Sequence, residues 1–330
     1  MATVHLDEAA SEVLRRGASA LGWKADSLRQ VRLLTGGVSG SRTFRVSRPE
    51  GDAVLKVTLE GLPEHVLERA RREVLFYWYL EPTLPLRVPR LLASKEGRGG
   101  CAAVLLLEAF EPLPPVRTWD RDLRNEVVRQ LAVLHSEFTD GEEELSGYEW
   151  LGQPLTPDPQ HAVTDALALW EGLAASPLLT GVLTQERLEG IRLALDALPS
   201  TLADVERLPL TLCHGDCHAG NLLQDPEQRL VWADWQEVRL GRGVEDLSFL
   251  LQRAQGEGAS LPEGALIAKY QWSLARRHPD PPSVEALTLG VSAVELRQRL
   301  LEWPHYLQES PDGMERNVLR IEELASPFGF

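Results

Sequence analysis

Residues 213–223 are Cys-His-Gly-Asp-Cys-His-Ala-Gly-Asn-Leu-Leu, and residues 231–237 are Val-Trp-Ala-Asp-Trp-Gln-Glu. Asp216 therefore stands five residues before Asn221 and eighteen before Asp234. The apolar residues 222–223 and 230–232 predict two short strands beside these polar side chains. Two carboxylates and one carboxamide would thus be carried on neighbouring strands.

This set of side chains is what phosphoryl transfer requires. One carboxylate must lie near the attacking hydroxyl, and two oxygen-bearing side chains must hold Mg²⁺, which neutralises charge on the β- and γ-phosphates. In this interpretation Asp216 is the base or orienter, and Asn221 and Asp234 are the metal ligands. A polar loop followed by an ordinary hairpin is the plainer alternative, but it does not account for the whole pattern.

The segment resembles the catalytic loop of the aminoglycoside phosphotransferase / choline kinase-like family, and the resemblance runs from about residue 33 to residue 251. It implies an α+β, two-lobed, protein-kinase-like fold with a β-rich N-terminal lobe and a mainly helical C-terminal lobe. We expect residues 1–110 to form the nucleotide-binding lobe with a leading helix at 6–23. Residues 111–330 would form the catalytic and substrate-binding lobe, with an irregular insertion at 141–159.

A glycine-rich turn between two strands is predicted at residues 34–46. Gly36, Gly37 and Gly40 would let backbone N–H groups approach a triphosphate. The family has a similar Gly-Gly-x-Ser pattern, which here includes Ser39. The same letters also mark tight hairpins, and the turn is not a Walker A motif because no Gly-Lys-Ser/Thr follows.

Lys56 lies in the apolar run 53–57, where a lysine is costly unless it is paired or at an edge. Kinases place a lysine there to hold the α- and β-phosphates; a snorkelling edge lysine is the alternative. Glu73 lies in a helical segment that resembles the family's helix C. An ion pair with Lys56 would fix the lysine head; otherwise Glu73 is one more solvated charge.

The strand predicted at 102–107 resembles the hinge between the two lobes, where backbone groups around Glu108 and Phe110 would bind adenine. The resemblance thus implies ATP and Mg²⁺ as cofactors. It also places His135 on the helix before the catalytic loop, where we expect a structural role, and Asp246 where it would brace that loop.

The phosphate acceptor is expected in the C-terminal lobe, facing Asp216. The candidate lining residues are Gln236, Glu237, Trp272, Glu295, Trp303 and Tyr306. A net charge of −15 argues against nucleic-acid binding. It is compatible with a cationic acceptor, although an acidic surface can reflect solubility alone.

The composition suggests an intracellular enzyme. Three cysteines make no disulfide framework, and neither a signal peptide nor an apolar run of about 18 residues is present. We therefore expect a cytoplasmic monomer or homodimer without a membrane partner.

Three alternatives are weaker. Cys213, His214, Cys217 and His218 could bind zinc, but four ligands in six residues cannot easily surround an ion. A protein kinase would need an activation segment and an Ala-Pro-Glu motif after Asp234, and neither exists. A non-catalytic kinase-like nucleotide-binding protein would not need the complete set of polar residues. We therefore predict an ATP- and Mg²⁺-dependent phosphotransferase that moves the γ-phosphate to a hydroxyl of an aminoglycoside-, choline- or sugar-like molecule.

Overall fold

The computed structural model describes residues 6–24, 28–34, 40–139, 141–153 and 159–326. The chain forms two compact units. The first unit comprises Met1–Val116, Ser146–Gly152 and His214–Arg239, and the second comprises Arg117–Leu145, Gln153–Cys213 and Leu240–Phe330. The segment with Asp216, Asn221 and Asp234 therefore belongs to the same unit as the N-terminal sheet. The predicted functional division at residue 110 remains a prediction.

The first unit is built on a five-stranded antiparallel sheet in the order β1-β2-β3-β5-β4. Its strands are β1 (Arg29–Leu34), β2 (Arg42–Arg48), β3 (Gly51–Leu59), β4 (Leu91–Arg98) and β5 (Cys101–Glu108). Helix α1 (Glu8–Ala20) is capped by Asp7, whose carboxylate accepts the N–H of Ala10 at 2.6 Å. It packs closely on β3, because a Cβ at Gly17 would lie 2.4 Å from a methyl of Val57.

Helix α2 (Glu64–Tyr79) carries a charged residue on its buried face. Val74 and Phe76 are fully buried, as their apolar side chains require, but the neighbouring Glu73 is only 1 % exposed. A buried carboxylate is costly unless it is paired. The helix therefore indicates the position of a polar site within the first unit.

A second, three-stranded sheet carries the polar segment of the first unit. It has the order β6-β8-β9, formed by β6 (Glu111–Pro112), β8 (Leu222–Gln224) and β9 (Leu230–Trp232). Leu222 pairs with Trp232 in antiparallel register, so the two strands predicted from the sequence are present. Asn221 ends a 3₁₀ turn (Ala219–Asn221) just before β8, and Asp234 follows β9.

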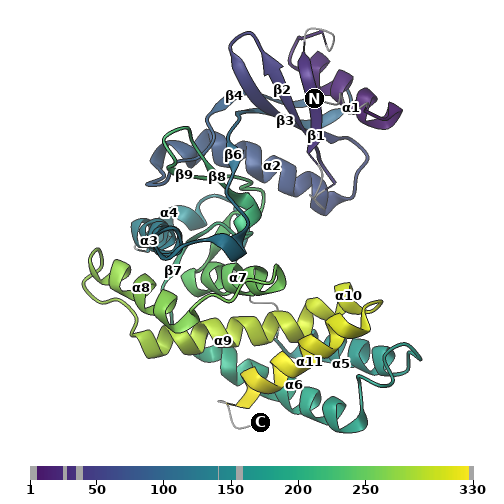
Figure 1. The fold of residues 1–330 in the computed structure, drawn as a ribbon, viewed down its shortest axis with the longest axis vertical. Helices are drawn as coiled ribbons and strands as arrows, with labels where there is room; N and C mark the ends of the chain where they lie inside the picture. Colours follow the sequence, from purple (N-terminus) through teal and green to yellow (C-terminus); the bar gives the residue numbers. More distant parts are fainter. Residues whose placement is uncertain (1–5, 25–27, 35–39, 140, 154–158, 327–330) are drawn as a thin grey trace. The chain divides into compact units, whose positions relative to one another are not determined.

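The second unit is mainly helical. Its elements are α3 (Arg121–Phe138), α4 (Glu142–Ser146), α5 (Pro159–Ala174), α6 (Gln185–Val205), α7 (Gly243–Gly256), α8 (Glu263–Ala275), α9 (Val284–Leu301), α10 (Trp303–Leu307) and α11 (Pro311–Ala325), with β7 (Leu210–Cys213) paired to β10 (Arg239–Arg242). Helix α9 contacts α6, α7, α8 and α11 (Figure 1). Trp170 of α5 is buried against α9 and donates its indole N–H to the carbonyl of Leu300 at 3.0 Å.

The insertion predicted as irregular at 141–159 contains helix α4, so that part of the prediction is wrong. Three consecutive glutamates precede Leu145, and glutamate and leucine are good helix formers. Leu145 is 2 % exposed, so apolar burial gives this short helix the stability that its length alone would not provide.

Candidate active site

Asp216 and Asn221 are joined by hydrogen bonds in the turn before β8. The side-chain amide nitrogen (Nδ2) of Asn221 donates to the backbone oxygen of Asp216 at 2.9 Å and to the Asp216 carboxylate at 3.0 Å. These bonds leave the side-chain amide oxygen of Asn221, the atom predicted to bind the metal, directed away from Asp216. Nε2 of His218 lies 3.6 Å from the same carboxylate.

The surroundings of Asp216 keep it ionised. Burial alone would raise the pKa of Asp216, but the hydrogen bond and charge of His218, together with the hydrogen bond from Asn221, lower this pKa to about 2. A group with so low a pKa accepts a proton poorly at neutral pH. Its carboxylate is suited to accepting a hydrogen bond from a hydroxyl and holding it in place.

His214 connects the turn of Asp216 to the strand of Asp234. Its Nε2 donates to the carbonyl of Ala233 at 3.0 Å, and its Nδ1 accepts the backbone N–H of Asp216 at 3.3 Å. These two bonds correspond to the neutral tautomer with the proton on Nε2. The His214 ring also lies 4.5 Å from the Trp235 ring. Sequence reasoning considers His214 only as a ligand in the weaker zinc alternative and does not predict this connecting role.

Gly215 lets the turn pass close to the chain that follows Asp234. Its φ is +84°, a region that side chains with a Cβ disfavour. A Cβ there would lie 2.0 Å from the carbonyl oxygen of Glu237. The close approach of the Asp216 turn to the chain after Asp234 therefore requires glycine at this position.

Lys56 of β3 lies between two carboxylates. Its Nζ is 2.7 Å from Glu73 on α2 and 2.7 Å from Asp234, so the ion pair predicted between Lys56 and Glu73 is confirmed. Burial alone would lower the pKa of Lys56, but Asp234 and Glu73 raise it above its ordinary value. Burial also raises the pKa of Glu73 despite the nearby ammonium group.

Asp234 itself has a left-handed backbone with φ of +64°. Such a conformation is uncommon for residues other than glycine and often marks a functional position. Here it accompanies a side chain that reaches Lys56, a contact that sequence reasoning did not predict. Gln236, two residues later, places its side-chain oxygen 3.4 Å from the Lys56 ammonium.

Part of the predicted nucleotide site lies outside the described residues: Gly36, Gly37 and Ser39. Gly40 is described, with φ of +80°, and a Cβ there would lie 3.0 Å from Val66 of α2. In the predicted hinge, the backbone N–H of Glu108 donates to the carbonyl of Arg90 at 3.0 Å. Phe110 is buried, and the Arg87 guanidinium lies 5.5 Å from its ring. The nucleotide-binding roles of these residues remain predictions.

The zinc alternative finds no support in the parts of the chain that the structure describes. There, the group of possible metal ligands within 4.8 Å of one another is His135, Cys213 and Asp246; Cys217 and His218 are not members. His135 is already satisfied, because Nδ1 hydrogen-bonds Tyr270 at 2.6 Å and Nε2 lies 3.2 Å from Asp246. These contacts suit the structural role predicted for His135.

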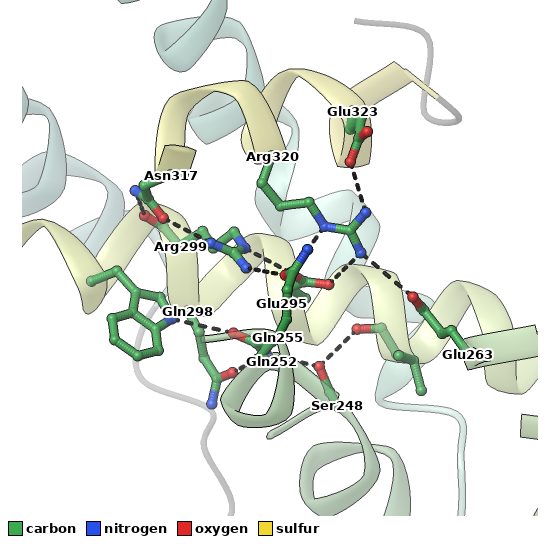
Figure 2. A network of polar contacts seen from close by, with 12 residues as sticks. Ser248, Gln252, Gln255, Glu263, Glu295, Gln298, Arg299, Asn317, Arg320 and Glu323 are labelled. Atoms are coloured by element: carbon green, nitrogen blue, oxygen red, sulfur yellow. Dashed lines mark hydrogen bonds and ion pairs between the residues drawn. The ribbon is translucent and has the colours of Figure 1, made fainter. Parts of the chain in front are cut away.

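Two carboxylates predicted to line the acceptor pocket are neutralised by arginines. Figure 2 shows Glu295 of α9 between Arg299 and Arg320. Arg299 donates to it at 2.7 Å, and Arg320 of α11 donates to both of its oxygens at 3.1 and 2.8 Å. Glu237 lies 2.5 Å from Nε of Arg69 on α2. Both carboxylates therefore already have cationic partners within the chain, and their predicted contribution to an acceptor pocket remains a prediction.

The aromatic acceptor candidates have different surroundings. Trp272 is half exposed, with Lys269 4.1 Å above its ring, and Tyr306 is 78 % exposed. Trp303 donates its indole N–H to Gln252 at 3.2 Å. Their predicted contribution to an acceptor pocket remains a prediction.

Comparison with known proteins identifies the family. Residues 30–287 match the phosphotransferase enzyme family. The chain belongs to this family. It is thus an enzyme of the phosphotransferase class, and the predicted family is confirmed. No curated protein matches the chain in sequence.

Solved structures confirm the predicted protein-kinase-like fold. The GDP and kanamycin complex of APH(2")-IIia is 15 % identical, with a TM-score of 0.64 over 92 % of this chain and 95 % of that one. The choline kinase LicA from Streptococcus pneumoniae is 16 % identical, with a TM-score of 0.62 over 97 % and 100 % of the two chains. A microcompartment-associated aminopropanol kinase is 16 % identical, with a TM-score of 0.62 over 91 % of each chain. These neighbours are small-molecule kinases, in agreement with the predicted class.

None of the described helices combines the length and the hydropathy that a bilayer-spanning helix needs.

Proposed function

We propose that this phosphotransferase moves the γ-phosphoryl group of ATP to a hydroxyl of a small molecule and that it requires Mg²⁺. The observation that carries the proposal is the meeting of Lys56, Glu73 and Asp234 at 2.7 Å contacts, within the same unit as the hydrogen-bonded pair Asp216 and Asn221. A lysine fixed by a helix glutamate, a metal-ligating aspartate and a carboxylate for the acceptor are the parts that kinases use.

The residues present fit a magnesium ion. Asp234 offers a carboxylate, and Asn221 offers its side-chain amide oxygen. Both hydrogen bonds from Asn221 to Asp216 use the amide nitrogen, so the amide oxygen is not engaged by them. Oxygen ligands of this kind suit Mg²⁺, whereas thiolates suit softer metals. Neither Asp234 nor Asn221 offers a thiolate. When bound, the ion would neutralise charge on the phosphate oxygens.

The chain's own groups would divide the remaining work. Lys56, held by Glu73, would pair with nucleotide phosphates. Asp216 would accept a hydrogen bond from the acceptor hydroxyl and orient its oxygen toward the phosphorus atom. Because the pKa of Asp216 is lowered to about 2, orientation is favoured over early proton removal. The hydroxyl proton would pass to the Asp216 carboxylate late, when the oxygen–phosphorus bond has largely formed and the proton has become acidic, and from Asp216 it would be lost to water.

The acceptor is a hydroxylated small molecule. The structural neighbours include proteins named for kanamycin complexes, choline and aminopropanol. All three of these compounds carry a hydroxyl group and a cationic nitrogen, which is a protonated amine in two of them and a quaternary ammonium in choline. An acceptor of that type is compatible with the net charge of −15. The neighbour with kanamycin also holds GDP, so the preference for ATP over GTP needs direct competition.

A screen tests the proposal. The purified chain is incubated with Mg-ATP or Mg-GTP and pools of amino alcohols, aminoglycosides and sugars, and both melting temperature and ADP or GDP release are recorded. We expect nucleotide to raise the melting temperature only with Mg²⁺, and at least one pool to stimulate release. Asp216→Asn should keep the Mg-nucleotide shift and lose the stimulation. A chain that binds Mg-nucleotide but is stimulated by no pool, alone or in mixtures, supports the non-catalytic alternative.

A further inference from the structure

One face of α2 follows the segment that contains Asp234. Arg69 pairs with Glu237, Arg72 donates to the backbone oxygen of Gln236 at 3.1 Å, and Glu73 reaches Asp234 through the shared lysine. Phe76 stacks on Trp235 with ring centroids 4.4 Å apart and planes 9° apart. Residues 69, 72, 73 and 76 have the spacing i, i+3, i+4, i+7, which places them on one stripe of a helix. The stripe sets the position of α2 along this segment.

Arg72 also contacts residues 146–152, another segment of the first unit. Its Nε donates to the backbone oxygen of Trp150 at 3.3 Å, and Trp150 belongs to the segment Ser146–Gly152. That segment is joined to the chain after Asp234, because the N–H of Gly152 donates to the carbonyl of Val238 at 3.3 Å. A single guanidinium therefore bridges α2, residues 146–152 and the segment after Asp234.

We propose that Arg72 is a positioning residue for phosphoryl transfer, which holds α2 in the register that keeps Glu73 on Lys56 and Lys56 beside Asp234. This inference rests on the proposed function. The guanidinium is a rigid planar fork, so its two donors fix the carbonyls of Gln236 and Trp150 relative to each other. A lysine ammonium also has several donors, but its flexible stem and freely rotating head would hold the two carbonyls less rigidly.

The contacts that position α2 are made by unmodified side chains. In protein kinases the placement of helix C depends on phosphorylation of the activation loop. In this chain Glu237 supplies a built-in negative charge at Arg69, and Nη1 of Arg72 lies 3.7 Å from the same carboxylate. The helix is thus held in place without covalent modification.

Nucleotide affinity, measured by calorimetry on the full chain with Mg-ATP, tests the role of Arg72. We expect Arg72→Ala to raise the Kd about tenfold, equivalent to about 1.4 kcal/mol, and Arg72→Lys to raise it by less. Arg71→Ala is the matched control, because it removes the same charge from the exposed neighbouring position on α2. It should change the Kd by no more than about twofold, as surface substitutions usually do. Lys56→Met should abolish binding.

A double variant separates positioning from general destabilisation. If Arg72 acts through Glu73, the combination Arg72→Ala with Glu73→Gln should bind Mg-ATP about as weakly as Glu73→Gln alone, because coupled residues are not additive. Additive losses would overturn the inference, as would an Arg72→Ala affinity equal to that of Arg71→Ala.

Two further results remain decisive. If Arg72→Ala fails to fold, the same Mg-ATP titration is made with Arg72→Lys at a temperature where this variant is folded. Weaker Mg-ATP binding than wild type supports the inference, and wild-type affinity overturns it. A folded wild-type chain that does not bind Mg-ATP overturns the proposed function and the inference together. Wild-type binding that is lost in Lys56→Met and unchanged in Arg72→Ala overturns the inference alone.

Discussion

Gly215→Ala is a sharp test of the geometry at the active site. Gly215 has φ of +84°, and a Cβ there would lie 2.0 Å from the carbonyl oxygen and 2.7 Å from the carbonyl carbon of Glu237. A left-handed backbone costs a residue with a Cβ about 1–2 kcal/mol. The overlap adds about 1–3 kcal/mol, which is typical of overpacking. The obstacle is backbone, so no side-chain rotation can relieve it.

The combined cost of Gly215→Ala is therefore roughly 2–5 kcal/mol. At about 2–4 °C per kcal/mol, this corresponds to a melting temperature lowered by roughly 4–20 °C. The turn of Asp216 must also move away from the segment after Asp234, so Mg-dependent nucleotide binding should weaken. Differential scanning calorimetry and nucleotide titration measure the two effects.

Gly190→Ala is the matched control for Gly215→Ala. Gly190 lies within α6, and nothing is found within 4 Å of the Cβ that alanine would add. Alanine is favoured over glycine in a helix by about 0.8–1 kcal/mol, so this variant should melt at or slightly above the wild-type temperature. If Gly215→Ala behaved like Gly190→Ala in both assays, the close approach of the Asp216 turn to the chain after Asp234 would be wrong.

Three further predictions use other parts of the molecule. The pKa of Asp216 is lowered from 3.8 to about 2 in the folded chain. The ionised Asp216 therefore stabilises the fold above about pH 3.8, and this stabilisation is lost as pH falls through about 2. A plot of kcat against pH should accordingly show no inflection from Asp216 between about pH 5 and 8. An inflection there that Asp216→Asn removes would contradict this. Asp234→Ala should abolish the Mg²⁺ dependence of nucleotide binding in a titration with and without the ion; full dependence in the variant would exclude Asp234 as a ligand. Glu295→Ala should lower the free energy of unfolding in urea by about 3–5 kcal/mol, because Arg299 and Arg320 lose their buried partner. Mg-nucleotide affinity, measured at urea concentrations below the unfolding transition, should stay within about twofold of wild type. A loss of affinity with unchanged stability would place Glu295 in the binding site instead.

The sequence predicted the parts of the site that obey local rules. Asp216, Asn221 and Asp234 are placed by short strands and turns whose pattern can be recognised along the chain. Lys56 could be recognised because a lysine in a buried strand needs a partner, and the resemblance to the family's helix C indicated Glu73 as that partner. The order of sheet and helices followed from the same periodicities and from the family resemblance.

The sequence could not show which distant groups meet. Arg72 donates to Trp150 and Gln236, which are 78 and 164 residues away along the chain, and backbone acceptors leave no signal in the letters. Glu295 looked available to an acceptor, because a helical pattern identifies a face without identifying its partners. Burial of Glu295 depends on Arg320 from α11, which only tertiary packing brings to it.

Phosphorylation of an acceptor found in the screen is the most direct test of the central claim. Product formation is followed by mass spectrometry with Mg-ATP for wild type and for Asp216→Asn at equal, saturating nucleotide. We predict a phosphorylated hydroxyl on the acceptor with wild type, and a kcat lower by roughly 10²-fold or more in the variant, with nucleotide affinity little changed. Near-normal turnover by Asp216→Asn on that acceptor would contradict the account.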